Sequence, residues 1–80
     1  MNAVLTIKSE YAAEVTYPQH GTRRIYRRTA RGISCEHVGR NGSHTMEFDG
    51  IRAERLIVDA DECVRDWLRA LPAKREARHA

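Results

Sequence analysis

The 80-residue sequence lacks the features that define secreted disulfide scaffolds and membrane proteins. It has only two cysteines, Cys35 and Cys63, too few for the disulfide framework of a small secreted domain. No apolar run approaches the roughly 20 residues that a membrane helix needs. The first ten residues, MNAVLTIKSE, have no basic segment followed by an apolar one, as a signal peptide would. We therefore expect a cytoplasmic protein with two reduced thiols and no membrane association.

The sequence also lacks the common motifs of catalysis and metal binding. It has no glycine-rich phosphate loop, no G-x-S-x-G and no evident carboxylate pair. Cys35, His37, His44 and Cys63 could be drawn together as a zinc site or as a Cys–His nucleophile pair. However, there is no C-x-x-C or H-x-x-x-H spacing to support either. We expect a protein that is not an enzyme and binds no metal or other cofactor.

Positive charge, in contrast, is concentrated in one stretch, Thr22 to Arg40. Its six arginines and one glutamate give a net charge of +5, whereas the whole chain carries +3. Guanidinium groups bind phosphates and carboxylates in a bidentate manner and stack on bases. We predict a partner-binding site here, made of Arg23, Arg24, Tyr26, Arg27, Arg28, Arg31 and Arg40. The alternative is a solvated edge strand, whose charges merely discourage aggregation.

The first third of the chain has the alternation of β-strands. Residues 3–8 are rich in β-branched side chains and form a first predicted strand. Residues 11–17 alternate, with Ala13, Val15 and Tyr17 on one face, which predicts a strand with one wet face. A short helix over 10–14 is the alternative, because two alanines favour it. Pro and Gly predict a turn over 18–21.

Residues 22–31 fit either a strand or a helix. As a helix, they would place three arginine pairs four residues apart, where like charges repel. Ile25, Tyr26 and Thr29 favour a strand, and a strand is our prediction. Its arginines would then lie on both faces, and both faces cannot be buried cheaply. We therefore expect this strand to be an edge or a protruding arm.

The next part of the chain predicts further hairpins. A turn over 30–32 leads into a strand over 33–38, with Ile33, Cys35 and His37 on one face. Asn41-Gly42 is a strong hairpin signal. It is followed by a strand over 44–48, a turn at 49–50 and a last strand over 51–58. Residues 53–56 could instead be helical.

The last element is predicted to be an amphipathic helix. Asp59 is a natural N-cap, with Glu62 three residues later. Apolar residues form one stripe of this helix and Pro72 ends it. The members of the stripe are Cys63, Val64, Trp67, Leu68 and Leu71. Trp67, the only tryptophan, is predicted to cover the sheet, and residues 73–80 are predicted to be a basic, flexible tail.

Together these elements predict an α+β fold in which an antiparallel meander of about five strands is covered by one C-terminal helix. Residues 1–72 would form a single domain. A chain of this size buries only about 60–65% of the surface that its unfolded form exposes. We therefore also consider a homodimer that buries more apolar area.

The segment DADECVRDWLRALP, following a meander in so short a chain, resembles the small phage-borne anti-CRISPR proteins. One of them likewise ends its sheet with an acidic N-cap and a W-x-x-x-L-P helix. The resemblance covers about fourteen residues and the layout. It implies an inhibitor in a bacterial host cell that docks on a CRISPR surveillance complex and blocks binding of target DNA. Many such inhibitors are acidic DNA mimics, whereas this chain is basic and would need an acidic protein surface or exposed nucleic acid.

Three functions therefore remain open at this stage. The first is a protein-binding inhibitor of anti-CRISPR type. The second is a nucleic-acid-binding module that uses the basic hairpin, and the third is an assembly factor whose sheet edge pairs into a dimer. We rank them in this order.

Overall fold

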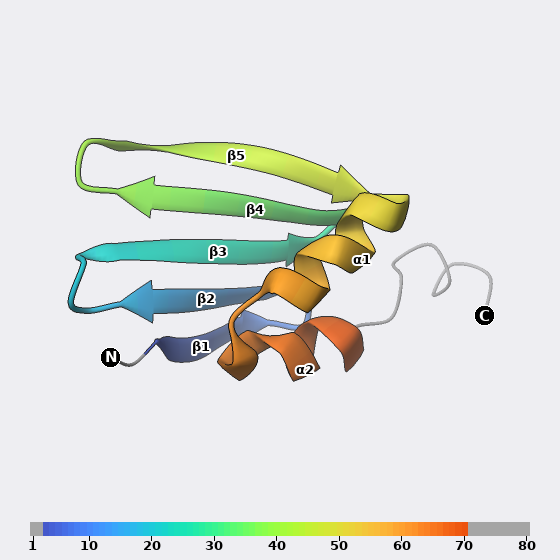
Figure 1. Cartoon of the computed structure of the whole chain (residues 1–80), viewed down its shortest axis with the longest axis horizontal. Coiled ribbons are helices and arrows are strands. Elements are labelled where there is room, and N and C mark those ends of the chain that lie inside the picture. The colour runs from blue at the N-terminus through green and yellow to red at the C-terminus, as the bar shows by residue number, and fades with distance from the viewer. Residues whose placement is uncertain (1–2, 71–80) are drawn as a thin grey trace.

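The structure, a computed structural model, describes residues 3–70 as five strands followed by two helices (Figure 1). The strands are β1 (Val4–Ser9), β2 (Ala12–Tyr17), β3 (Thr22–Arg28), β4 (Gly32–Gly39) and β5 (Gly42–Asp49). The helices are α1 (Gly50–Asp59) and α2 (Glu62–Ala70). Neither helix is long and apolar enough to cross a membrane.

Each strand pairs antiparallel with the next one in sequence, so the sheet order is β1-β2-β3-β4-β5. This confirms the predicted α+β fold with a five-stranded antiparallel meander. It also confirms that residues 22–28 form a strand. The prediction that this strand is an edge is wrong, because β3 is the central strand and has a neighbour on both sides. A sheet built by successive hairpins places its third strand in the middle, whatever charges that strand carries.

One face of the sheet is covered by the two helices, and we call it the helix side; the other is the open face (Figure 1). Period-two alternation decides which side chains point to each. Ala13, Val15 and Tyr26 are fully buried on the helix side, which confirms the alternation predicted for β2. The core also contains Ile33, Ala53, Ala60, Val64 and Leu68. It is built largely of small and medium side chains, with Tyr26 as its largest member.

The predicted last strand, over 51–58, is wrong, since these residues form helix α1. The helical alternative over 53–56 is the conformation found. Gly50, with a φ of +54°, turns the chain from the end of β5 onto the helix side. Once there, the segment buries Ala53 and packs Leu56 and Ile57 against the core. This i, i+3, i+4 spacing is that of an amphipathic helix lying on a sheet.

Helix α2 begins at Glu62, later than the predicted N-cap at Asp59, which is the last residue of α1. The first α2 turn is anchored by the carbonyl of Asp61, which accepts the backbone N–H groups of Val64 and Arg65 at 3.0 and 3.1 Å. Val64 and Leu68 are buried as predicted. Trp67 is only partly buried, so it covers the rim of the core and not its centre. Leu71, Pro72 and the predicted tail over 73–80 lie outside the described residues.

The turns lie at two opposite ends of the sheet (Figure 1). The β2–β3 and β4–β5 turns share one end, which we call the distal end. The β3–β4 turn and the start of α1 lie at the other, the proximal end. Gly21 closes the β2–β3 turn with a φ of +66°, and its N–H bonds to the carbonyl of Tyr17 at 3.0 Å. Gly39 pairs with Gly42 across a two-residue turn of Arg40 and Asn41.

Candidate binding surface

The arginines of β3 divide between the two faces of the sheet. Arg23 and Arg27 are exposed on the open face. Arg24 and Arg28 share the helix side with Tyr26 and are half-buried. The concentration of charge in the sequence therefore does not become a single patch in the fold. Tyr26 has no exposed surface at all, so it is a core residue and not a contact residue for a partner.

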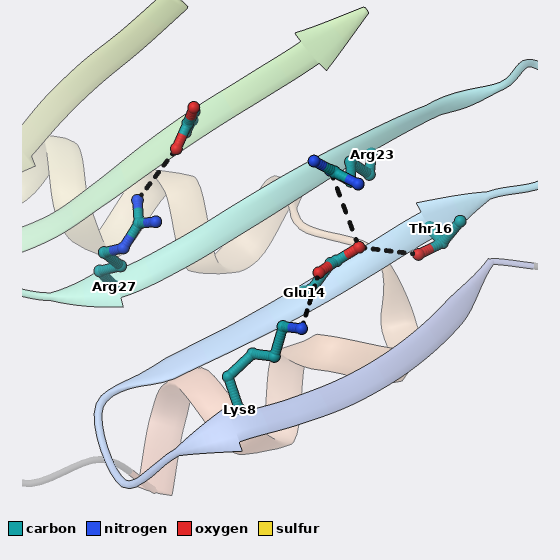
Figure 2. Close-up of polar contacts among 6 residues, drawn as sticks. Lys8, Glu14, Thr16, Arg23 and Arg27 are labelled. Atoms are coloured by element: carbon teal, nitrogen blue, oxygen red, sulfur yellow. Dashed lines mark hydrogen bonds and ion pairs between the residues drawn. The ribbon is translucent and has the colours of Figure 1, made fainter. Parts of the chain in front are cut away.

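On the open face, each β3 arginine faces a glutamate on a neighbouring strand (Figure 2). Arg27 Nη1 lies 3.1 Å from Glu36 Oε1, and Arg23 Nε lies 3.8 Å from Glu14 Oε2. Glu14 also meets Lys8 Nζ at 3.4 Å. The register explains this pattern, because both glutamates flank Ile25, which lies between the two arginines in β3. Carboxylates interleaved with the arginines make the open face a mixed-charge surface and reduce its attraction for anions.

On the helix side, the two β3 arginines have structural contacts. The Arg24 guanidinium lies 5.7 Å from the centre of the Tyr17 ring, a cation–π distance. Burial acts to lower the pKa of Arg24, but the Tyr26 and Tyr17 hydroxyls outweigh this effect and raise it, so Arg24 stays charged. Arg28 Nη2 donates to the carbonyl of Leu68 at 3.3 Å, which satisfies a C-terminal carbonyl of α2. Neither arginine is therefore freely exposed to a partner.

Tyr17 links the sheet to the segment between the helices. Its hydroxyl donates to a carboxylate oxygen of Asp61. Burial raises the pKa of Tyr17 well above its usual range, and the bond to Asp61 adds to this effect. Tyr17 thus remains a neutral donor, and Arg24 is held on its ring. The carboxylate of Asp61, the residue directly before α2, is therefore occupied by a contact within the fold.

The two turn arginines lie at opposite ends of the sheet and are both exposed. Arg40 is at the distal end, where its Nε would lie 3.4 Å from a Cβ placed on Gly21. It therefore spans from the β4–β5 turn to the β2–β3 turn. Arg31 is at the proximal end, where it lines a hollow together with Arg28 and Glu54. The seven predicted residues are thus spread over both ends and both faces.

Two histidines join the arginines at the distal end, and their sequence pattern had suggested only metal ligands or nucleophile partners. Arg24 pairs with His37, and His37 with His44, so the three lie in one cross-strand row on the helix side. The two imidazole rings stack with centroids 5.7 Å apart and an interplanar angle of 4°. They line a shallow hollow with Arg40 and Asn41 of the β4–β5 turn. The β4–β5 turn fixes which residues of the two strands face each other, and it places His37 opposite His44. The Asn41-Gly42 hairpin signal in the sequence could therefore have predicted this histidine pair.

We call the residues Arg23, Arg24, His37, Arg40 and His44 the distal basic cluster. Within residues 3–70, neither Arg24 nor Arg40 forms an ion pair with a carboxylate, whereas Arg23 shares Glu14 with Lys8. The cluster therefore offers two uncompensated guanidinium groups beside two stacked imidazoles. Such an array suits carboxylates or phosphates of a partner.

The described part of the chain contains no group of three or more His, Cys, Asp or Glu side chains placed to hold a metal ion. Cys35 and Cys63 are free, the first half-buried and the second exposed. Burial raises the pKa of both thiols. Comparisons with protein-family models, with curated proteins and with solved structures find no match for this chain.

Proposed function

We propose that this protein is a non-enzymatic binding protein that docks on an acidic surface of a protein complex through its distal basic cluster. The observation that carries the proposal is the contrast between the two sets of arginines. Those of the open face have glutamate partners within the sheet, whereas Arg24 and Arg40 have none among the described residues. Uncompensated guanidinium groups at the end of a rigid hairpin are favourable anchors for carboxylates.

The open face favours a protein target over a nucleic acid. Its basic residues alternate with Glu14 and Glu36, and Glu47 lies in the same cross-strand row as Arg27. Phosphates laid along this face would be repelled by the carboxylates, whereas a protein surface of mixed charge could match them. The distal basic cluster alone provides only a few phosphate contacts, which would give weak binding, because each contacted phosphate adds to the affinity and to its salt dependence.

The specific target that we propose is a CRISPR surveillance complex, and the action is to block binding of target DNA, as the resemblance to anti-CRISPR proteins implies. The layout of the fold supports this target, since the meander is followed by amphipathic helices, of which α2 carries the segment with the resemblance. Bound at an acidic protein subunit, a domain with extents of 42 × 22 × 21 Å would obstruct the path of the target DNA by its bulk.

The test measures whether the protein inhibits purified surveillance complexes in a target-DNA binding assay. Two exposed turn arginines form a matched pair of variants: Arg40→Glu at the distal end and Arg31→Glu at the proximal end. We expect Arg40→Glu to weaken inhibition and complex binding at least tenfold, and Arg31→Glu to retain both within about twofold. Circular dichroism should show that both variants are folded.

Two results would overturn the proposal. If the wild-type protein neither binds nor inhibits any complex tested, the target is wrong. If both variants weaken binding equally, general positive charge is responsible and the distal basic cluster is not the site. Titration of the protein with a free 30-base-pair DNA duplex tests the nucleic-acid alternative. If that alternative holds, the protein binds the duplex without any complex, and the logarithm of its affinity falls linearly with the logarithm of the salt concentration.

A further inference from the structure

The two edges of the sheet differ in how they are protected. Edge strand β1 has an irregular register between Ile7 and Ser9 and carries Lys8, two features that discourage pairing with another strand. Edge strand β5 has neither an irregular register nor a lysine. All eight of its residues pair in regular register with β4, and it contains no lysine, arginine or proline. The outer backbone groups of β5 are therefore a regular template for an additional strand.

Exposed apolar surface accompanies this open template. Met46 is 48% exposed on the helix side of β5, and Phe48, on the same side, is only partly buried under Arg52 of α1. Ile51, in the first turn of α1 and two residues after the end of the strand, is 79% exposed. An eight-residue edge with apolar side chains next to it is unusual for a protein that stays monomeric, because it invites association.

We propose that β5 pairs antiparallel with β5 of a second copy of this chain, which joins two sheets into one of ten strands. The sequence of β5 is complementary to itself when the two-fold axis passes through Met46. Met46 then lies opposite Met46 of the second copy. In the same register Phe48 lies opposite His44, and Glu47 lies opposite Thr45. The axis keeps the helices of both copies on one side of the joined sheet.

The charges on β5 favour the register centred on Met46 over the register centred on the next residue, Glu47. Centred on Glu47, the pairing would place two glutamates directly opposite each other, which is destabilising. Centred on Met46, no two carboxylates face each other, and both exposed methionines are covered. The distal basic cluster lies toward the end of each sheet, so the dimer would carry two clusters pointing in opposite directions.

The test uses matched apolar residues on the two edge strands. Met46 and Ile7 are 48% and 52% exposed. We expect the wild-type protein to sediment at twice the monomer mass at micromolar concentration. Met46→Lys should raise the dimer dissociation constant at least tenfold, while Ile7→Lys should leave it unchanged. A wild-type protein that is monomeric at 100 μM, or equal effects of the two variants, would overturn the proposal.

A cross-linking experiment covers the case in which Met46→Lys does not fold. In a Cys35→Ser, Cys63→Ser background, which removes the thiol directly opposite position 46 on β4 as well as the exposed one, Met46→Cys should form a disulfide-linked dimer on mild oxidation, because the two positions face each other across the axis. Ile7→Cys serves as the control and should stay monomeric. Equal cross-linking of both variants, or none of Met46→Cys, would contradict pairing through β5. Binding to a surveillance complex is measured separately, so a failure of this inference leaves the proposed function intact.

Discussion

Leu68 is the residue whose truncation tests the architecture most directly. It lies on α2, is 1% exposed, and packs in the same cluster as Val64 and Tyr26. Its backbone carbonyl also accepts the bond from Arg28 that ties α2 to β3. Leu68→Ala keeps this carbonyl and the helix propensity, so the change isolates the loss of the buried side chain.

The expected cost follows from the burial. Fully buried leucines cost about 2–5 kcal/mol when replaced by alanine, through lost transfer free energy and the cavity that remains. A domain of this size has a total stability of roughly 4–12 kcal/mol. A loss of about 3 kcal/mol is therefore a large fraction of the whole. For a chain of this length, it lowers the melting temperature by about 12–24 °C.

Thermal and urea unfolding followed by circular dichroism would measure this loss, and the fluorescence of Trp67 provides a second signal on α2. Val58→Ala is the control, because Val58 is 62% exposed on α1, and we expect its effect to stay within about 0.5 kcal/mol. A Leu68→Ala variant that melts at the wild-type temperature would show that α2 does not cover the core.

Two further predictions concern the sheet and its electrostatics. A Cβ at Gly32 would lie 2.1 Å from the carbonyl oxygen of Phe48, so Gly32→Ala should lower the melting temperature by at least 10 °C, whereas Gly39→Ala, with its nearest contact at 3.7 Å, should not. The raised pKa of Tyr17 means that stability is retained below pH 10 and falls as the pH rises above about 10, where the unfolded chain ionises first. Urea unfolding at pH 8 and 11 should show a smaller fall for Tyr17→Phe; an equal fall would contradict the assignment.

Local sequence patterns were sufficient to predict most of the sheet. The alternation of Ala13 and Val15, the turn residues at 18–21 and the Asn41-Gly42 signal are each contained in a few consecutive residues, and their outcome does not depend on the rest of the chain. The apolar stripe of α2 is of the same kind, since Val64 and Leu68 are four residues apart and face the core together. Such patterns reflect the geometry of a single element.

Residues 51–58 show where local patterns fail. Their run Leu56-Ile57-Val58 suits a strand as well as a helix, and propensity alone does not separate the two. The rest of the fold made the choice: a five-stranded sheet left one apolar face uncovered, and Gly50 turned the chain onto it. On that face a helix buries Ala53, Leu56 and Ile57 together, which a strand of the same sequence would not.

The candidate site depended on tertiary structure for the same reason. The sequence by itself determined that positive charge is concentrated in Thr22 to Arg40 and that β3 alternates. It did not determine that Glu14 and Glu36 compensate its open-face arginines, or that His37 and His44 stack beside Arg24. Those facts depend on pairing between strands, whose partners are separated in sequence and are selected by the packing of the whole sheet.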